Sequence, residues 1–353
     1  MNANPTDHFE GPRRGEIRDF PEVQRAWVSE TAGGPDSLVL RDIARPEPGP
    51  GQVRVRVQAC GLNYPDVLLV ADRYDVRLPR PFVPGMELAG TIDALGAGAH
   101  GFSIGDRVAA YLESGGLAQY ALTNVSSVMR VPEVISLDIA ASALVTYSTA
   151  YHALVDRGTL QAGERLLVLG ASGGVGLAAI ALGKALGAHV IAGTSSDVKS
   201  RVARQQGADD VFVYPERVDD PRALARQIKD VCGAGSDVVF DPVGGEYTEA
   251  AFRAISWNGR HLVVGFVAGI PRVPLNLPLL KGAQLVGVNA GSFSERYPAR
   301  FAANISRVFE LIASGRVRPL APTLVPFENA RDGLADLAGR KVVGKLVVRV
   351  AEA

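Results

Sequence analysis

The 353-residue sequence is poor in cysteine and has no excess of charge of either sign. Its two cysteines, Cys60 and Cys232, lie far apart, so they build neither a disulfide framework nor a cysteine-rich zinc site. Lysine plus arginine equals aspartate plus glutamate at 37 each, which leaves no broad charged surface for nucleic acid or an anionic membrane. These absences favour small, roughly neutral partners.

Long hydrophobic runs are missing as well. No apolar stretch approaches the roughly 18 to 20 residues of a membrane span, and the polar start MNANPTDHFEGPRRGEIRDFP lacks the apolar core of a signal peptide. We therefore expect a cytoplasmic protein with no membrane partner. The 47% of hydrophobic residues and the length of the chain are sufficient for two domains.

Two different patterns divide the chain. Residues 24–131 carry short alternating runs such as QVRVRVQA and TIDAL, broken by proline and glycine, which predict a β-rich segment with one short helix near PDVLLVADR. From about residue 145, the runs LLVLG, HVIAG, DVFVY, DVVFD and HLVVGF alternate with helix-like stretches, which predicts a parallel, doubly wound sheet. The final KVVGKLVVRV is suited to a strand that returns to the first domain.

A glycine loop, GASGGVG, occupies residues 170–176 between the run RLLVLG and an alanine-rich helix. Glycines at Gly173, Gly174 and Gly176, with Val175 among them, allow a tight turn and let backbone N–H groups approach a pyrophosphate. The amino end of the following helix favours the negative charge of that group. The loop therefore indicates a dinucleotide site.

The same letters also fit the G-x-S-x-G nucleophile elbow of hydrolases. Ser172, Asp241 and His261 follow in the order that such enzymes use. Against this alternative, the preceding β-rich segment has no HGGG-type oxyanion loop, and a nucleophile has no need of Val175 and Gly176. A purely structural glycine turn is a third interpretation.

Six stretches in this order resemble the medium-chain dehydrogenase/reductase superfamily, and within it the zinc-free NADPH:quinone oxidoreductase branch. They are ACGLNYPDVLL (59–69), PFVPGMELAGTIDALG (81–96), GDRVAAY (105–111), STAYHAL (148–154), GASGGVGLAAIALGKALGAHVI (170–191) and VVGKLVV (342–348). The resemblance implies an α/β fold with a flexible tail (1–23), a GroES-like β-rich catalytic domain (24–145), a Rossmann domain with a doubly wound parallel sheet (146–290) and a return segment completing the catalytic domain (291–353). The active site would lie between the two domains.

The resemblance also places Asn63, Met86 and a residue near Val145 where metal-dependent relatives bind zinc. An amide, a thioether and an aliphatic side chain make no zinc site, so we expect a metal-free enzyme. Glu87 remains beside Met86, but the sequence indicates no partner for it. Without a metal to polarise a simple ketone, a quinone or activated alkene is the more suitable hydride acceptor, because its conjugated system spreads the negative charge.

Two residues are candidates for catalysis. The resemblance implies that Asn63 contacts the nicotinamide end or the substrate; the alternative is that it stabilises its own turn. Tyr64 could donate a hydrogen bond or a proton, or it could simply pack. Tyr74 and Tyr147 are weaker candidates for the same role.

Several residues are expected at the nicotinamide end of the cofactor. Thr149 would open a helix beside the cofactor, with an ordinary helix cap as an equal alternative. Phe266 and Val267 follow the run HLVV at the carboxyl end of a strand, where open α/β sheets bind ligands, and Asn289 is implied nearby. Phe266 could equally be buried in the core. His152 is expected to be structural, like His189 and His261.

The end of the second strand of the parallel sheet predicts NADPH rather than NADH. NAD-specific sites have an acidic residue about 20 residues after the glycine loop, whereas this sequence has Thr194, Ser195 and Ser196. Lys199 follows, and Tyr214 closes the run DVFVY; in the quinone reductases a similarly spaced Ser, Lys and Tyr surround the 2′-phosphate. As alternatives, Lys199 could merely face solvent, and Asp197 could bind the ribose of NADH.

The sequence thus predicts an NADPH-dependent, metal-free reductase that transfers hydride to a quinone. An ene-reductase of α,β-unsaturated ketones, aldehydes or thioesters is the nearest alternative. A catalytically silent NADPH-binding sensor or interaction protein is an alternative of another class, because a fold does not fix a function. We also expect a homodimer joined through the edge strand near QLVGVNAG (284–291).

Overall fold

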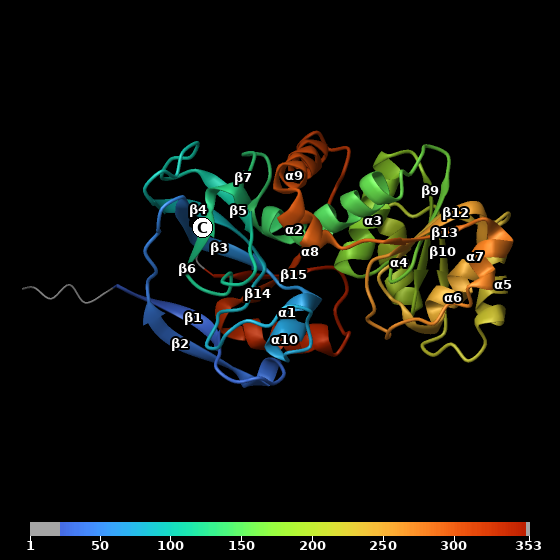
Figure 1. The fold of residues 1–353 in the computed structure, drawn as a ribbon, viewed down its shortest axis with the longest axis horizontal. Helices are drawn as coiled ribbons and strands as arrows, with labels where there is room; N and C mark the ends of the chain where they lie inside the picture. The colour runs from blue at the N-terminus through green and yellow to red at the C-terminus, as the bar shows by residue number, and fades with distance from the viewer. Residues whose placement is uncertain (1–21, 351–353) are drawn as a thin grey trace, which may run out of the picture.

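The computed structural model describes residues 22–350, which form two lobes on either side of a central helix (Figure 1). One lobe is rich in β-strands, and the other contains a sheet covered by helices. The expected tail, residues 1–23, lies outside the described residues except for its last two. Val23 already begins strand β1 (Val23–Ser29), which pairs with β2 (Leu38–Ala44) in a two-stranded sheet.

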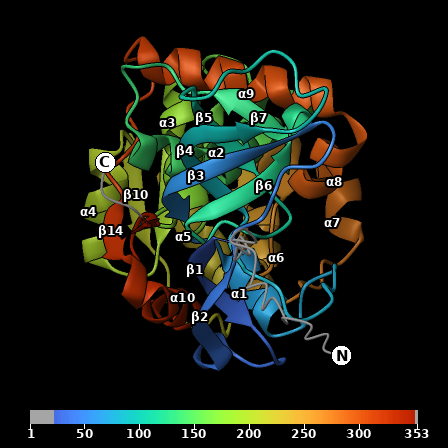
Figure 2. The same ribbon diagram turned by 90° about the vertical axis from the view of Figure 1, so that its left-hand side faces the viewer.

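The β-rich lobe is built on a seven-stranded sheet that faces the viewer in Figure 2. Its order is β14-β15-β3-β4-β5-β7, with β6 also paired to β3. The strands are β3 (Gln52–Gly61), β4 (Glu87–Leu95), β5 (Arg107–Tyr111), β6 (Tyr120–Asn124), β7 (Val128–Arg130), β14 (Thr323–Pro326) and β15 (Leu346–Arg349). Val53, Val55 and Val57 alternate along β3 and are fully buried in one core, as the period of a half-buried strand requires. The short helix α1 (Tyr64–Val70) follows β3.

The second lobe contains the predicted parallel sheet, in the order β10-β9-β8-β11-β12-β13. Its strands are β8 (Arg165–Val168), β9 (His189–Thr194), β10 (Asp210–Val213), β11 (Ser236–Asp241), β12 (Ile255–Val263) and β13 (Gln284–Gly287), and its helices are α3 (Gly174–Ala185), α4 (Asp197–Gln205), α5 (Pro221–Cys232), α6 (Gly245–Arg253) and α7 (Asn276–Lys281). The strand order reverses between β8 and β11. Ligands of doubly wound sheets bind at such a switch point, beyond the carboxyl ends of the strands.

Helix α2 (Leu137–Tyr151) joins the two lobes. It begins at Ser136, whose hydroxyl accepts a hydrogen bond from Ile139 N, and it continues into a π-helical turn at His152–Arg157. The helix packs on β3, β4 and β5 on one side and on α3 and α9 on the other. The expected domain boundary at residues 145 and 146 therefore falls inside a helix that both lobes share.

The last part of the chain runs back to the first lobe. Helices α8 (Ala290–Arg296) and α9 (Pro298–Ala313) lie beside α2, between the lobes (Figure 1). Helix α10 (Ala330–Ala338) then packs against α1, and β15 pairs antiparallel with β3. Within residues 22–350, no helix combines the length and the apolar character needed to cross a membrane.

Candidate active site between the lobes

The glycine loop connects β8 to α3, with Gly173 as the N-cap. The first three amides of the helix, at Gly174, Val175 and Gly176, have no intrahelical acceptor because they belong to its first turn. Gly176 is the position that only glycine fits: a Cβ there would lie 2.4 Å from the carbonyl oxygen of Gly170. The backbone of Gly176 is therefore packed closely against that of Gly170. The backbone at Gly173, Gly174 and Val175 is only half-buried and is available to an anion.

The hydrolase interpretation of this loop is wrong. His261 Nε2 lies 3.0 Å from Asp241 Oδ2, but within residues 22–350 the Nδ1 atom of His261 has no hydrogen-bond partner. The Ser–His hydrogen bond that activates a nucleophile is thus not formed at Ser172. The reason lies in the sheet: His261 is on β12 opposite Val239 of β11 and is fully buried.

Asp241 instead fixes the loop that follows β11. Its carboxylate accepts hydrogen bonds from Val243 N at 2.9 Å, Gly244 N at 3.0 Å and Thr248 Oγ1 at 2.5 Å. Burial acts to raise the pKa of Asp241, but the hydrogen bonds with His261 and Thr248 and the nearby His261 charge outweigh it, so the pKa is lowered. A carboxylate that stays ionised holds this loop at the carboxyl edge of the sheet.

The structure brings together two of the three residues predicted to recognise a 2′-phosphate. Lys199 Nζ donates a hydrogen bond to Ser195 Oγ at 3.1 Å, because Ser196 caps α4 and so places Lys199 one turn beyond Ser195. Tyr214 is buried, and burial raises its pKa to about 12, partly offset by a backbone contact with Gly170. Asp197, the alternative ribose ligand, is exposed.

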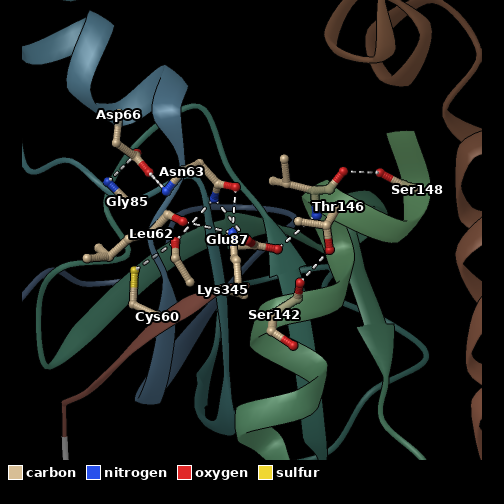
Figure 3. A network of polar contacts seen from close by, with 12 residues as sticks. Cys60, Leu62, Asn63, Asp66, Gly85, Glu87, Ser142, Thr146, Ser148 and Lys345 are labelled. Carbon is tan, nitrogen blue, oxygen red and sulfur yellow. Dashed lines mark hydrogen bonds and ion pairs between the residues drawn. The ribbon is translucent and has the colours of Figure 1, made fainter. Parts of the chain in front are cut away.

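A buried polar network lies on the β-rich side of the interlobe space (Figure 3). Asn63, the N-cap of α1, donates from Nδ2 to Glu87 Oε1 at 2.9 Å and to Gly61 O at 3.2 Å. Lys345 Nζ lies 2.5 Å from Glu87 Oε1 and 2.5 Å from Asn63 Oδ1, and it donates to Leu62 O at 2.9 Å. All three hydrogens of the ammonium group and both hydrogens of the amide are therefore used.

The expectation that Glu87 lacks partners is wrong. Its second oxygen, Oε2, accepts a hydrogen bond from Val145 N of α2 at 2.8 Å, so the carboxylate binds groups from both sides (Figure 3). Glu87 is fully buried, and the side chain of Lys345 is 10% exposed. The network thus joins β4, α1, α2 and the residue just before β15 through hydrogen bonds.

The zinc positions implied by the resemblance do not fit a metal ion. The ammonium of Lys345 already occupies the oxygens of Asn63 and Glu87 that would face a metal. Val145 contributes only its backbone N–H, and Met86 offers a thioether, a poor ligand for zinc. No group of three His, Cys, Asp or Glu side chains suited to a metal occurs in the described part of the chain.

Nearby, the carboxyl group of Asp66 completes the start of α1. It accepts hydrogen bonds from Asn63 N at 2.8 Å and Gly85 N at 3.1 Å. Burial nevertheless raises its pKa to about 7, because desolvation outweighs these two hydrogen bonds and the attraction of Lys345.

A cavity of about 380 Å³ opens between the β-rich lobe and α8. Met86 and Tyr111 form part of its wall on one side, and Asn289 and Phe301 do so on the other. The volume lies within the range of small-molecule sites. Tyr74 also borders this cavity, whereas Tyr64 does not, and Tyr147 is buried elsewhere.

The residues predicted at the nicotinamide end lie on α2, in the loop after β12 and at the start of α8. Thr149 does not open a helix: it lies in the last turn of α2, whose cap is Ser136, so the capping alternative is wrong too. Phe266 is 48% exposed, which contradicts the alternative that it is buried in the core, because the loop after β12 leaves the sheet there. Asn289 caps α8 by accepting a hydrogen bond from Ser292 N at 2.9 Å.

The remaining candidates have clear structural contacts. Val267 accepts a hydrogen bond from Arg340 through its backbone oxygen. His152 bonds Asp156 at 2.8 Å and stacks on Phe293, which fixes α2 to α8, in agreement with a structural role.

Sequence reasoning missed three residues of the site. Lys345 stands out as the one charged residue of VVGKLVV, but nothing in the sequence assigns it to Glu87. Thr146 packs on the glycine loop, with its methyl group 3.0 Å from where a Cβ of Gly174 would lie. Tyr111 ends the run GDRVAAY, and burial raises its pKa well above the ordinary value, so its hydroxyl remains a neutral hydrogen-bond donor.

Comparison with known proteins agrees with this architecture. Residues 49–133 match the alcohol dehydrogenase GroES-like domain, and residues 174–307 match the zinc-binding dehydrogenase domain. The chain is 33% identical to the mouse quinone oxidoreductase-like protein 2 over 314 residues, which cover 88% of each protein. The chain belongs to the quinone oxidoreductase branch of the medium-chain dehydrogenases/reductases.

Two further relatives sharpen the assignment. The human quinone oxidoreductase is 31% identical over 90% of this chain and 94% of its own length. A mycobacterial protein solved in complex with NADPH is 28% identical, with a TM-score of 0.86, over 92% of this chain and 99% of that structure. This medium-chain dehydrogenase/reductase is therefore an oxidoreductase with a nicotinamide cofactor. The matched zinc-binding dehydrogenase domain, residues 174–307, does not include Asn63, Met86 or Lys345.

Proposed function

We propose that this medium-chain reductase transfers a hydride from NADPH to a quinone without a metal. The observation that carries the proposal is the Lys345 ammonium between Asn63 and Glu87, where metal-dependent relatives would hold zinc. A simple ketone then has no Lewis acid to polarise it. A quinone has less need of one, because its ring distributes the negative charge that it accepts.

The residues at the cofactor side fit NADPH. The open amides of Gly174 and Val175, at the amino end of α3, would hold the pyrophosphate. Ser195 and Lys199 would hold the 2′-phosphate, which a serine hydroxyl can donate to and an ammonium can pair with. When bound, NADPH supplies the hydride, and the protein supplies binding, orientation and exclusion of water.

The residues at the acceptor side fit a flat, mostly apolar molecule. Met86, Leu69 and Phe301 give the cavity apolar walls, and the hydroxyls of Tyr74 and Tyr111 offer hydrogen bonds to a carbonyl oxygen. The catalytic roles predicted for Asn63 and Tyr64 have less support than those of Tyr74 and Tyr111, because the amide hydrogens of Asn63 are already used and Tyr64 lies outside the cavity wall. In this arrangement Asn63 acts by positioning Glu87 and Lys345.

The test is oxidation of NADPH by the purified protein with a panel of quinones and of α,β-unsaturated ketones, aldehydes and thioesters. Turnover with quinones supports the proposal. Turnover restricted to the unsaturated carbonyl compounds would establish the ene-reductase instead. Tight NADPH binding with no turnover would establish a sensor or interaction protein. A second arm uses exhaustive chelation, and activity that disappears with the loss of one bound zinc per chain would contradict metal-free catalysis.

We also propose a homodimer formed through β13. Among residues 22–350, this strand pairs only with β12 and so leaves one edge of the sheet open. Leu279 and Leu280 of the adjacent α7 are 79% and 65% exposed, and Leu285 of β13 is exposed as well, which is unusual for large apolar side chains so close together. Sedimentation that gives only monomer at micromolar concentration would contradict this assembly.

A further inference from the structure

The interlobe cavity is acidic. Three carboxylates from three separate segments border it: Asp75 after α1, Glu113 after β5 and Glu295 on α8. No lysine, arginine or histidine contributes to its wall; Arg73 and Arg296 adjoin lining residues in the sequence but do not line the cavity. The wall thus combines three negative charges with no positive one.

These carboxylates are also free of ion pairs. Within residues 22–350, none of the three lies within salt-bridge distance of a basic side chain. The contrast with the cofactor side is clear, since Lys199 there offers a positive charge to a phosphate. Among the described residues, the three carboxylates at the cavity wall therefore have no basic side chain in direct contact.

We propose that Asp75, Glu113 and Glu295 make the acceptor cavity select uncharged or cationic substrates and reject anionic ones. This inference rests on the proposed function, and it narrows the substrate class to quinones or enones that carry no carboxylate, sulfonate or phosphate. Acyl thioesters on a phosphate-bearing carrier arm are disfavoured by the same carboxylates. Among the alternative substrates, this charge preference favours a quinone over an α,β-unsaturated thioester.

The physical basis is electrostatic focusing. Several like charges around a concave, partly apolar surface lower the local concentration of an ion of the same sign and raise that of the opposite sign. Because the three carboxylates are exposed at the rim, salt screens the effect, with a Debye length of about 10 Å at 0.1 M. Charge selection that fades as salt is added is therefore the specific signature of this arrangement.

The experiment uses one quinone ring with three side arms of equal length that end in a carboxylate, a hydroxyl or a trimethylammonium group. We measure kcat/KM with NADPH for each at 20 mM and 500 mM ionic strength. At low salt, the cationic quinone should exceed the anionic one by about tenfold or more, and the ratio should fall several-fold at high salt. Equal values for the three arms would overturn the inference.

Two variants locate the effect. Glu113→Gln combined with Glu295→Gln removes two of the three charges and should reduce the cation-to-anion ratio at low salt by about threefold or more. Glu133→Gln combined with Asp230→Asn also removes two exposed carboxylates, neither of which lines the cavity, and should keep the wild-type ratio. A ratio that falls equally in both variants would assign selection to the net charge of the protein and contradict the inference.

A failure of the proposed function is distinguishable from a failure of this inference. If none of the three quinones is reduced, hydride transfer to quinones is refuted, and dissociation constants of the same compounds from the NADPH-loaded protein are then measured by equilibrium dialysis. Tighter binding of the cationic compound, lost in the double variant, still supports charge selection. Binding that ignores charge overturns it.

Discussion

The two halves of the interlobe site use hydrogen-bonding groups in opposite ways. The glycine loop at the start of α3 leaves the amides of its first turn without intrahelical partners, and its backbone is half-buried. The network of Asn63, Glu87 and Lys345 leaves no donor unused and is almost wholly buried. Unused donors mark a place prepared for a ligand, whereas satisfied ones mark a place that stabilises the fold.

The cavity beside the network combines both properties. Its walls are packed by buried residues such as Met86, but the carboxylates and tyrosines at its surface have few partners in the protein. We therefore expect the loop and the cavity to bind ligands, and the network between them to position the residues around it.

The largest effect is expected where Gly176 packs against Gly170 and Ala171 in the glycine loop. Gly176→Val places side-chain atoms where a Cβ is already 2.4 Å from Gly170 O and 2.8 Å from Ala171 Cα. We expect a loss of about 3 kcal/mol or more in the free energy of unfolding, measured in urea, and loss of NADPH binding, measured by calorimetry.

Gly173→Ala is the matched control for this loop. Its Cβ would meet only Gly170 O, at 3.6 Å, and would otherwise extend into open space. The free energy of unfolding should change by less than about 1 kcal/mol, while the dissociation constant of NADPH rises because the methyl group covers the backbone. Unchanged NADPH affinity would mean that the pyrophosphate binds elsewhere.

The network is tested by removing one charge and then both. Lys345→Met leaves the carboxylate of Glu87 buried without its counter-charge, so we expect a loss of about 3 to 5 kcal/mol in the free energy of unfolding. Adding Glu87→Gln should recover more than half of that loss, because the uncompensated charge is gone. Additive losses in this double-mutant cycle would show that the two groups do not depend on each other.

A smaller effect is expected at the phosphate end. Lys199→Ala should weaken NADPH binding by about 1 to 3 kcal/mol, the usual scale of a charge-assisted contact, and leave NADH binding nearly unchanged. Arg201→Ala, an exposed change on the same helix, serves as the control. Equal weakening of both cofactors, or a wild-type protein that prefers NADH, would contradict this assignment.

The smallest effects distinguish two tyrosines on the acceptor side. Tyr111→Phe removes a hydroxyl from the cavity wall and should lower kcat/KM for the quinone by about 1 kcal/mol, or roughly fivefold. Tyr64→Phe removes a hydroxyl that does not line the cavity and should change kcat/KM by less than about twofold. The reverse order would restore Tyr64 as the hydrogen-bond donor.

Features encoded within a few consecutive residues were predictable from the sequence. The parallel sheet followed from apolar runs at regular intervals, and the glycine loop from one strand–turn–helix segment. The contact between Ser195 and Lys199 also followed from spacing, because four residues across a helix start bring the two side chains together. The place of Thr149 within its helix and the exposure of Phe266 did not follow from the sequence, because a helix start and a loop's exposure depend on neighbours outside the local segment.

The amino-acid sequence was sufficient to predict the two kinds of lobe and the glycine loop, because each depends on residues that follow one another in the chain. The position of the Lys345 ammonium between Asn63 and Glu87 depends on the tertiary structure. Lys345 reaches Glu87 because the strand that follows it pairs antiparallel with β3, and strand pairing of this kind joins residues from opposite ends of the chain. The acidic cavity also depends on the tertiary structure, because its three carboxylates come from segments that are far apart in the sequence and meet only in the folded chain.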